Sequence, residues 1–288
     1  MTARIFARNH FTRGLDFIYL SDNRLPNGYG EHSHDYIEIV ITVEGRAKHR
    51  INGRLYDTVP GDVCVIQGGD MHGFELATKD FRVINIMYLP EKVVFPLPLL
   101  LKLPGYHALF VIEPAQRLEG EFRASLRLDS LGLSSVLALA RRMEDELEGK
   151  RLGFESILHA LLLELVATLS RDYSKSPEAG AQKLLRMGEA VAWMETNYAS
   201  QVSLSELAKK ASVSERQFLR LFTKAFGHPP VEHLLRIRVN AAAQMLKKSG
   251  CRVSEAAFAC GFNDSSYFTR QFKRILGVAP KRYTKLEP

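Results

Sequence analysis

Three histidines and one glutamate in the first quarter of the chain are the residues best suited to chemistry. His32, His34 and Glu38 fall close together, and His72 follows in a second segment. If the first three lie on one extended strand, alternation places them on the same face. Imidazole nitrogens and a carboxylate oxygen together suit Zn, Ni, Fe or Mn. The pattern therefore predicts a divalent-metal site, with a metal-free polar pocket for a small effector as the alternative.

Two segments near the C-terminus repeat one pattern. Residues 204–230 (LSELAKKASVSERQFLRLFTKAFGHPP) align with residues 253–280 (VSEAAFACGFNDSSYFTRQFKRILGVAP) after a one-residue insertion. Such a repeat indicates a supersecondary unit that is present twice. The aligned pairs are Ala208 with Ala257, Ser212 with Gly261, Val213 with Phe262, Phe218 with Phe268, Phe222 with Phe272, and Gly227 with Gly277.

Each copy carries the local signals of two short helices joined by a sharp turn. Ser212 or Gly261 permits the turn, and Ser214 or Asn263 is placed to cap the helix that follows. In that helix, aromatic residues four positions apart face the core, and a glycine suits the position after its end. The pattern predicts a helix-turn-helix in each copy.

The opposite face of the second helix in each copy is polar and basic. Short hydroxyl groups and long cationic side chains on an exposed helix suit the base edges and phosphates of DNA. The candidates are Ser214, Glu215, Arg216, Gln217, Arg220 and Lys224 in the first copy, and Ser265, Ser266, Thr269, Arg270, Lys273 and Arg274 in the second. A solvated charged face is the simpler alternative for one copy, but two aligned copies favour DNA binding.

The charge of the chain is segregated. The formal net charge is +7, and residues 181–288 hold 18 Lys and Arg against 8 Asp and Glu. Residues 1–180 hold 21 against 24, so all of the excess positive charge lies in the last 108 residues. A basic segment joined to a slightly acidic one indicates that only one half of the chain meets a polyanion.

The elements that must position the histidines are predicted to be β-strands. Short segments rich in Val, Ile and Tyr are separated by EG, NG and PGD turns, and Asn52-Gly53 is a strong hairpin signal. Many short strands in succession predict a small barrel or jelly roll. The predicted strands are 37–43, 46–51, 54–59, 62–67 and 81–89.

Helices are predicted from the middle of the chain onward. Residues 134–149 and 154–173 are amphipathic, residues 174–181 form a Ser-, Pro- and Gly-containing linker, and the chain is helical from 182. The apolar run at 158–169 suits either a dimer contact or packing against the barrel. The predicted fold class is α+β, with a cupin-like β-barrel, a helical dimerisation segment and an all-α domain that contains two helix-turn-helix units.

Residues 261–283 (GFNDSSYFTRQFKRILGVAPKRY) resemble the signature of the AraC/XylS family of transcription activators. The shared features are the glycine–aromatic pair, the Ser, Phe and Arg of the recognition helix, the basic pair and the Gly–Pro–Tyr exit. Residues 238–246 resemble the family's linker helix. The resemblance implies recognition helices over about 214–226 and 265–276 in successive major grooves. It also implies RNA polymerase as a partner.

The histidine segment resembles the two-part motif of the cupin superfamily. His32, His34, Glu38 and Gly45 match its first part, and His72 matches its second, although the usual Asn after the last His is absent. The order of domains and the segment EIVITVEG (38–45) resemble the rhamnose-operon regulators within AraC/XylS. This resemblance implies a sugar or a similar small polar effector by analogy.

Together these patterns predict a homodimeric regulator that is not an enzyme and binds double-stranded DNA. The expected domains are a sensor over 1–125, a helical dimerisation segment over 126–178 and a DNA-binding domain over 182–288. A metal-dependent cupin enzyme with a DNA-binding tail and a purely architectural DNA binder are the alternatives. Three cysteines without CxxC spacing, no signal peptide and no membrane-spanning run lead us to expect a cytoplasmic protein without a membrane partner.

Overall fold

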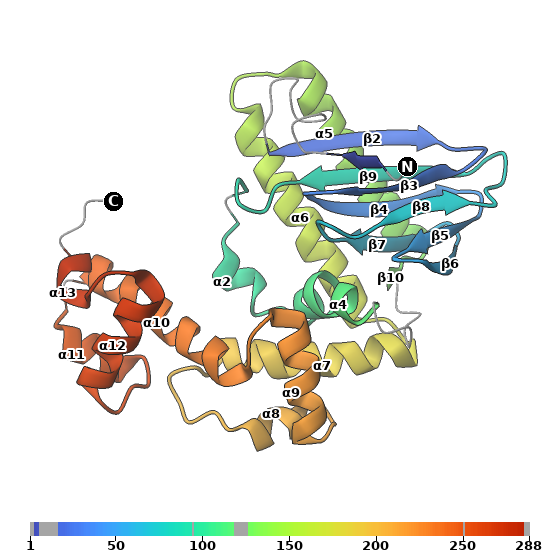
Figure 1. Ribbon diagram of the computed structural model, residues 1–288. Coiled ribbons are helices and arrows are strands. Elements are labelled where there is room, and N and C mark those ends of the chain that lie inside the picture. The colour runs from blue at the N-terminus through green and yellow to red at the C-terminus, as the bar shows by residue number, and fades with distance from the viewer. Residues whose placement is uncertain (1–2, 6–16, 94, 118–125, 250, 285–288) are drawn as a thin grey trace. The chain divides into compact units, whose positions relative to one another are not determined.

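The computed structural model describes residues 3–5, 17–93, 95–117, 126–249 and 251–284. The chain divides into one unit over residues 1–188 and a second unit over residues 189–288 (Figure 1). The strands all belong to the first unit, and the helical repeats belong to the second. Among the described residues, none of the helices combines the length and apolar character that a bilayer crossing requires.

The strands of the first unit form two five-stranded sheets. Sheet A contains, in spatial order, β1 (Ala3–Ile5), β3 (Tyr29–His34), β8 (His72–Glu75), β5 (Ala47–Ile51) and β6 (Arg54–Thr58). Sheet B contains, in spatial order, β10 (Leu126–Arg127), β7 (Asp62–Ile66), β4 (Ile37–Glu44), β9 (Arg82–Tyr88) and β2 (Ile18–Arg24). Consecutive strands alternate between the two sheets along much of the chain, which is the arrangement of a jelly roll.

An apolar core joins the two sheets. Val40, Ile66 and Val83 from sheet B pack in one cluster with Ile51 and Phe74 from sheet A. Side chains that alternate along each strand supply this inner face. The predicted fold class is confirmed, with a β-rich unit followed by a helical one.

The predicted Asn52-Gly53 hairpin joins β5 to β6 and also supports the strand that carries His72. Asn52 and Gly53 have φ values of +49° and +79°, as a two-residue turn between antiparallel strands requires. The Asn52 side chain donates to Asp70 over 2.8 Å and accepts from the backbone N–H of Met71 over 2.9 Å. The hairpin therefore holds the loop that leads into β8.

The Pro- and Leu-rich segment after β9 is helical, although its pattern predicts no clear element. It contains α2 (Leu97–Leu100), α3 (Pro104–Tyr106), a π-helical turn η1 (His107–Ile112) and α4 (Glu113–Arg117). Arg117 is buried, pairs with Glu113 and donates to the Val65 carbonyl over 2.7 Å. The Gln67 side chain donates to the Phe110 carbonyl over 2.9 Å. These bonds attach the segment to the end of β7.

Three long helices follow the short strand β10. They are α5 (Ser130–Gly149), α6 (Phe154–Ser174) and α7 (Ala179–Thr196), so the predicted linker contracts to residues 175–178. α5 packs against α6 and approaches β2. Leu158, Leu162 and Leu165 of the apolar run on α6 are fully buried within this single chain. Packing within the chain therefore accounts for the apolar character of residues 158–169, for which a dimer contact was the alternative prediction.

The second unit contains the two predicted helix-turn-helix copies. The first pairs α8 (Leu204–Lys210) with α9 (Glu215–Phe226), and the second pairs α11 (Val253–Ala259) with α12 (Ser265–Leu276). α10 (Pro230–Ser249) joins the copies, and α13 (Pro280–Tyr283) follows them. The repeated aromatics Phe218, Phe222, Phe268 and Phe272 are all fully buried, as the pattern predicts.

The turns and caps of the two copies agree with the sequence pattern except at one position. Ser212 and Gly261 have φ values of +55° and +82°. Ser214 caps α9 by accepting from the Gln217 N–H over 3.2 Å. The prediction that Asn263 caps α12 is wrong, because the one-residue insertion in the second copy places Asp264 there, where it accepts from Tyr267 N–H.

The loop after α7 packs against the second copy, although it leads into the first. Tyr198 packs against the second copy's core cluster, and Arg238 of α10 donates to the carbonyls of Tyr198 and Ser200 over 2.7 and 2.8 Å. A Cβ atom on Gly261 would lie 2.6 Å from the Ala199 carbonyl oxygen. The loop thus connects the two copies within this unit.

We expect Gly261→Ala to destabilise the second unit more than Gly277→Ala. Both glycines have left-handed φ values, but a Cβ on Gly277 meets no atom within 4 Å, so only backbone strain of about 1 kcal/mol is expected there. The clash with Ala199 should raise the loss to about 2–4 kcal/mol for Gly261→Ala. Urea unfolding followed by fluorescence of Trp193, the single tryptophan, measures both variants. Equal losses of unfolding free energy in the two variants would show that the loop after α7 can move away from residue 261 without destabilising the unit.

Candidate metal and effector site and DNA-binding surface

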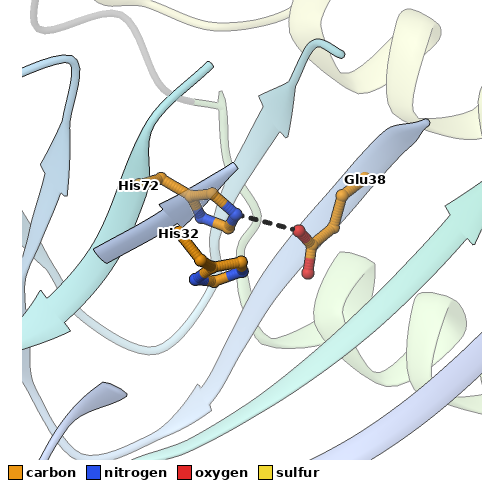
Figure 2. A group of neighbouring side chains, drawn as sticks. All are labelled: His32, Glu38 and His72. Atoms are coloured by element: carbon orange, nitrogen blue, oxygen red, sulfur yellow. Dashed lines mark ion pairs between the residues drawn. The ribbon is translucent and has the colours of Figure 1, made fainter. Parts of the chain in front are cut away.

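The four predicted site residues of the first unit converge between the two sheets. His34, Glu38 and His72 are at most 3% exposed, and His32 is 9% exposed. The expectation that the first three lie on one strand face is wrong. His32 and His34 lie on β3 of sheet A, the chain bends at residues 35–36, and Glu38 enters from β4 of sheet B. Figure 2 shows Glu38 pointing toward His72 and His32 across this gap.

Three of the donor atoms lie at the spacing expected around one metal ion. The Oε2 atom of Glu38 is 3.0 Å from His34 Nε2 and 3.2 Å from His72 Nε2, and the two nitrogens are 3.2 Å apart. Two donors that are each ~2.1 Å from one ion lie about 3.0 Å apart at a right angle and about 3.4 Å apart at the tetrahedral angle. His32 offers a further ligand atom, which lies within 4.8 Å of those of Glu38 and His72.

Backbone carbonyls orient two of the histidine rings. His34 Nδ1 is 2.9 Å from the Tyr36 carbonyl and His32 Nδ1 is 3.1 Å from the Gly30 carbonyl, so in each ring Nδ1 carries the proton and donates it. In the neutral imidazole, Nε2 then presents a lone pair. His34 Nε2 and the Glu38 carboxylate would therefore be two acceptors in contact. A proton or a metal cation between them removes the conflict, and carbonyl-oriented histidines are typical of metal sites.

Burial disfavours the charged form of His32, while Glu38 keeps a negative charge. Burial, with a smaller contribution from His72, lowers the pKa of His32 to about 4. Burial opposes ionisation of Glu38, but the adjacent His34 and His72 outweigh it and lower the pKa of the carboxyl group. Glu38 is therefore a buried carboxylate, which calls for a cationic partner.

His49 is a fifth residue of the cluster and lies outside the two-part motif. Its Nε2 atom is 3.3 Å from His72 Nδ1, and burial holds the pKa of His49 well below its usual value. Ala47, His49 and Ile51 alternate inward along β5, so strand alternation around the predicted hairpin could have indicated it. The contact orients the ring of His72.

A cavity of about 180 Å³ opens beside the cluster, between the two sheets. His32, Glu38 and His72 form part of its wall. The remaining described lining residues are Tyr19, Ser21, Asn23, Leu25, Tyr29, Tyr36, Phe74, Asn85 and Met87. A cavity of this kind, apolar in large part and with a few convergent polar groups, is the usual form of a small-molecule site.

The predicted DNA-contacting residues of the second unit lie at or near its surface. Gln217, Lys224 and Ser265 are partly buried, and the remaining nine are exposed. They belong to α9 and α12, apart from Ser214, which caps α9. The guanidinium of Arg270 lies over the Tyr267 ring, 5.9 Å from its centroid, and the Thr269 hydroxyl donates to the Ser265 carbonyl.

A groove beside α12 contains basic residues that the repeat alignment did not single out. Ser265, Ser266, Thr269 and Arg270 line it with residues of α10, α11 and α13. The additional basic residues are Lys247, Arg252, Lys281 and Arg282. All four lie outside the repeated segments, so the alignment of the two copies does not indicate them, and the sequence signal that they share is the charge count of the C-terminal half. Their position extends the surface suited to phosphates beyond the recognition helix.

Arg274 is already paired within the protein. Its Nη2 atom donates to Glu232 of α10 over 2.7 Å, and its Nε atom donates to Gln271 over 2.7 Å. Glu232 also pairs with Arg236 at 3.2 Å, and the hydrogen bond from Arg274 lowers the pKa of Glu232. Arg274 therefore connects the second recognition helix to the helix that joins the two copies.

Two protein-family models cover most of this chain. Residues 15–166 match the model described as AraC-like ligand binding domain, and residues 207–286 match the model described as helix-turn-helix domain. The first match includes the histidine cluster and the cavity, and the second includes both recognition helices.

Curated relatives match over nearly the whole length. The HTH-type transcriptional activator RhaS of Escherichia fergusonii is 31% identical over 260 residues, which cover 90% of this chain and 88% of that protein. RhaS of Klebsiella pneumoniae is 28% identical over 96% of this chain and 95% of that protein. A solved AraC-type regulator structure from Chromobacterium violaceum is 30% identical over 38% of this chain and 95% of that one, with a TM-score of 0.34. The chain belongs to the AraC family of transcription regulators.

Proposed function

We propose that this regulator activates transcription in response to a small polar, sugar-like effector bound between its two sheets. The observation that carries the proposal is a largely apolar cavity with a few convergent polar groups, in the same chain as two basic recognition helices. Relatives named as RhaS activators support the direction of regulation. A ligand that binds one arrangement of the protein better than another shifts the equilibrium between them. The test is the affinity for DNA selected in vitro, measured with and without added sugars.

We propose in addition that the histidine cluster holds one divalent ion of Zn, Ni, Fe or Mn. His32, His34, Glu38 and His72 would be its ligands, and His49 would support His72. The spacing of the donor atoms supports this assignment, and so does the contact between two acceptors, His34 Nε2 and the Glu38 carboxylate. Such an ion would neutralise the buried carboxylate and fix the wall of the cavity.

We propose further that the regulator is a homodimer and that it contacts RNA polymerase. Leu152, between α5 and α6, and Ile157, on α6, are exposed apolar residues, which supports a contact between two chains. A change in the geometry of such a dimer would alter the spacing of its DNA-binding units. Sedimentation of the full chain at tens of micromolar tests the dimer.

Metal analysis of protein purified without chelators or a histidine tag tests the metal assignment. We expect close to one ion per chain in the wild type and loss of the ion in His34→Ala and His72→Ala. His49→Ala should weaken affinity by about 10- to 100-fold, because it removes a residue that orients a ligand. His228→Ala, in the other unit, is the matched control and should keep the ion. Equal metal content in all five proteins would eliminate the metal site.

Substitutions on α12 should separate base recognition from phosphate contact. Arg270→Ala is expected to weaken specific binding by about 1–3 kcal/mol and to relax sequence preference. Lys273→Ala should weaken binding to all sequences and flatten the slope of log affinity against log salt by about one. Mobility-shift titrations on selected and random DNA at several salt concentrations measure both effects. If Arg270→Ala altered only the salt slope, its assignment to base edges would be wrong.

The ion pair with Glu232 predicts that Arg274 contributes less to DNA binding than Lys273. We expect Arg274→Ala to change the salt slope by clearly less than one, because Glu232 already neutralises the guanidinium. In a Glu232→Gln background, where Arg274 is released, the same substitution should have the larger effect. Identical effects of Arg274→Ala in the two backgrounds would show that the pair opens on DNA.

A further inference from the structure

One apolar side chain is exposed among the charged residues of the first recognition helix. The exposed residues of α9 are Glu215, Arg216, Leu219 and Arg220. Leu219 keeps 40% of its surface exposed. Residues three and four positions apart are neighbours on a helix surface, so Leu219 lies beside Glu215 and Arg216. The polar face of this helix therefore contains one position that cannot form a hydrogen bond through its side chain.

Leu219 lies in the part of α9 that contacts bases in helix-turn-helix proteins. The helix begins at Glu215, after the Ser214 side chain accepts from the Gln217 N–H over 3.2 Å, and Leu219 is its fifth residue. In such domains the N-terminal residues of the recognition helix contact base edges in the major groove. Leu219 is therefore placed to meet a base pair rather than the phosphates.

The major groove offers a leucine side chain one favourable contact. Base edges there present hydrogen-bond donors and acceptors, and the apolar group among the standard base pairs is the C5-methyl of thymine. A leucine over another edge would remove a donor or an acceptor from water without satisfying it. Over the thymine methyl, two apolar surfaces leave water together. An apolar residue at this position thus favours thymine.

The second copy carries a different group at the equivalent position. Phe218 aligns with Phe268, so Leu219 aligns with Thr269. The Thr269 hydroxyl donates to the Ser265 carbonyl over 2.8 Å, and its oxygen keeps a lone pair that can accept from a base edge. Leu219 offers only an apolar surface. The two recognition helices therefore differ in the chemistry that they present to the same place in the groove.

We infer that Leu219 is a specificity-determining residue of the first recognition helix and that it selects thymine at one base position by contact with the C5-methyl group. The neighbouring Arg216 and Arg220 are the candidates for the polar contacts on either side. This inference concerns DNA recognition, which membership of the AraC family supports, and it does not depend on the proposed effector or metal ion.

The test removes single methyl groups from the DNA. DNA selected in vitro by the full-length wild type supplies the binding sequence, and each thymine in it is replaced in turn by uracil, which keeps the pairing with adenine. Mobility-shift titrations compare the wild type, Leu219→Ala, Leu219→Gln and Leu55→Ala. Leu55→Ala is the matched control, because Leu55 is a leucine of β6 in the other unit with 46% of its surface exposed.

At one thymine position, uracil should weaken binding by the wild type and by Leu55→Ala about threefold to fivefold, as expected for the burial of one methyl group. The same replacement should leave the affinity of Leu219→Ala and Leu219→Gln unchanged, because the side chain that contacts the methyl is gone. At that position, 5-methylcytosine should bind the wild type more tightly than cytosine by a similar factor, because it restores the methyl group.

Three results would each overturn the inference. The first is a wild type that is indifferent to uracil at every position, which would leave Leu219 as an ordinary exposed apolar residue. The second is a uracil effect that persists in Leu219→Ala, because another residue would then contact the methyl group. The third is a selected sequence without a preferred thymine. The uracil scan of the wild type requires no substitution in the protein, so a folding defect in one variant would not remove the test.

Discussion

A buried carboxylate is the constraint around which the first unit is organised. Glu38 is 3% exposed, yet its pKa remains low, so the charge has to be compensated from within the protein. The compensating groups come from the facing sheet: His34 at the end of β3 and His72 at the start of β8. The hairpin through Asn52 and the loop before β8 hold His72 in place. The two sheets are thus connected by electrostatics as well as by their apolar core.

The second unit depends on packing rather than on a buried charge. Two copies of one pattern form their own aromatic cores, and the loop after α7 joins them through Tyr198 and the carbonyls that Arg238 satisfies. The pair between Glu232 and Arg274 adds a polar contact between the joining helix and the second recognition helix. The consequence for DNA recognition is that contacts far from the recognition surface help to set the relation between its two helices.

Local patterns predicted most of the fold, because repeats, turns and alternation are encoded by neighbouring residues. The ranges of β4, β5, β6, β7 and β9, the Asn52-Gly53 hairpin and both recognition helices follow from such signals. The site was harder, because its geometry depends on which strands face one another. His32, His34, Glu38 and His72 were identifiable from spacing, but Glu38 comes from the opposite sheet and His49 carries no motif. The inner-facing Asn85 and the paired state of Arg274 depend on contacts between residues distant in sequence, which no local pattern contains.

The two turns at Ser212 and Gly261 differ in the substitutions that they can accept. Both adopt a left-handed backbone, but only Gly261 faces a backbone carbonyl where a side chain would begin. The first turn holds a small polar residue at the cost of some backbone strain. The second turn does not have that freedom, because the loop after α7 packs against it. Equivalent positions of the two copies therefore differ in the side chains that they can accept.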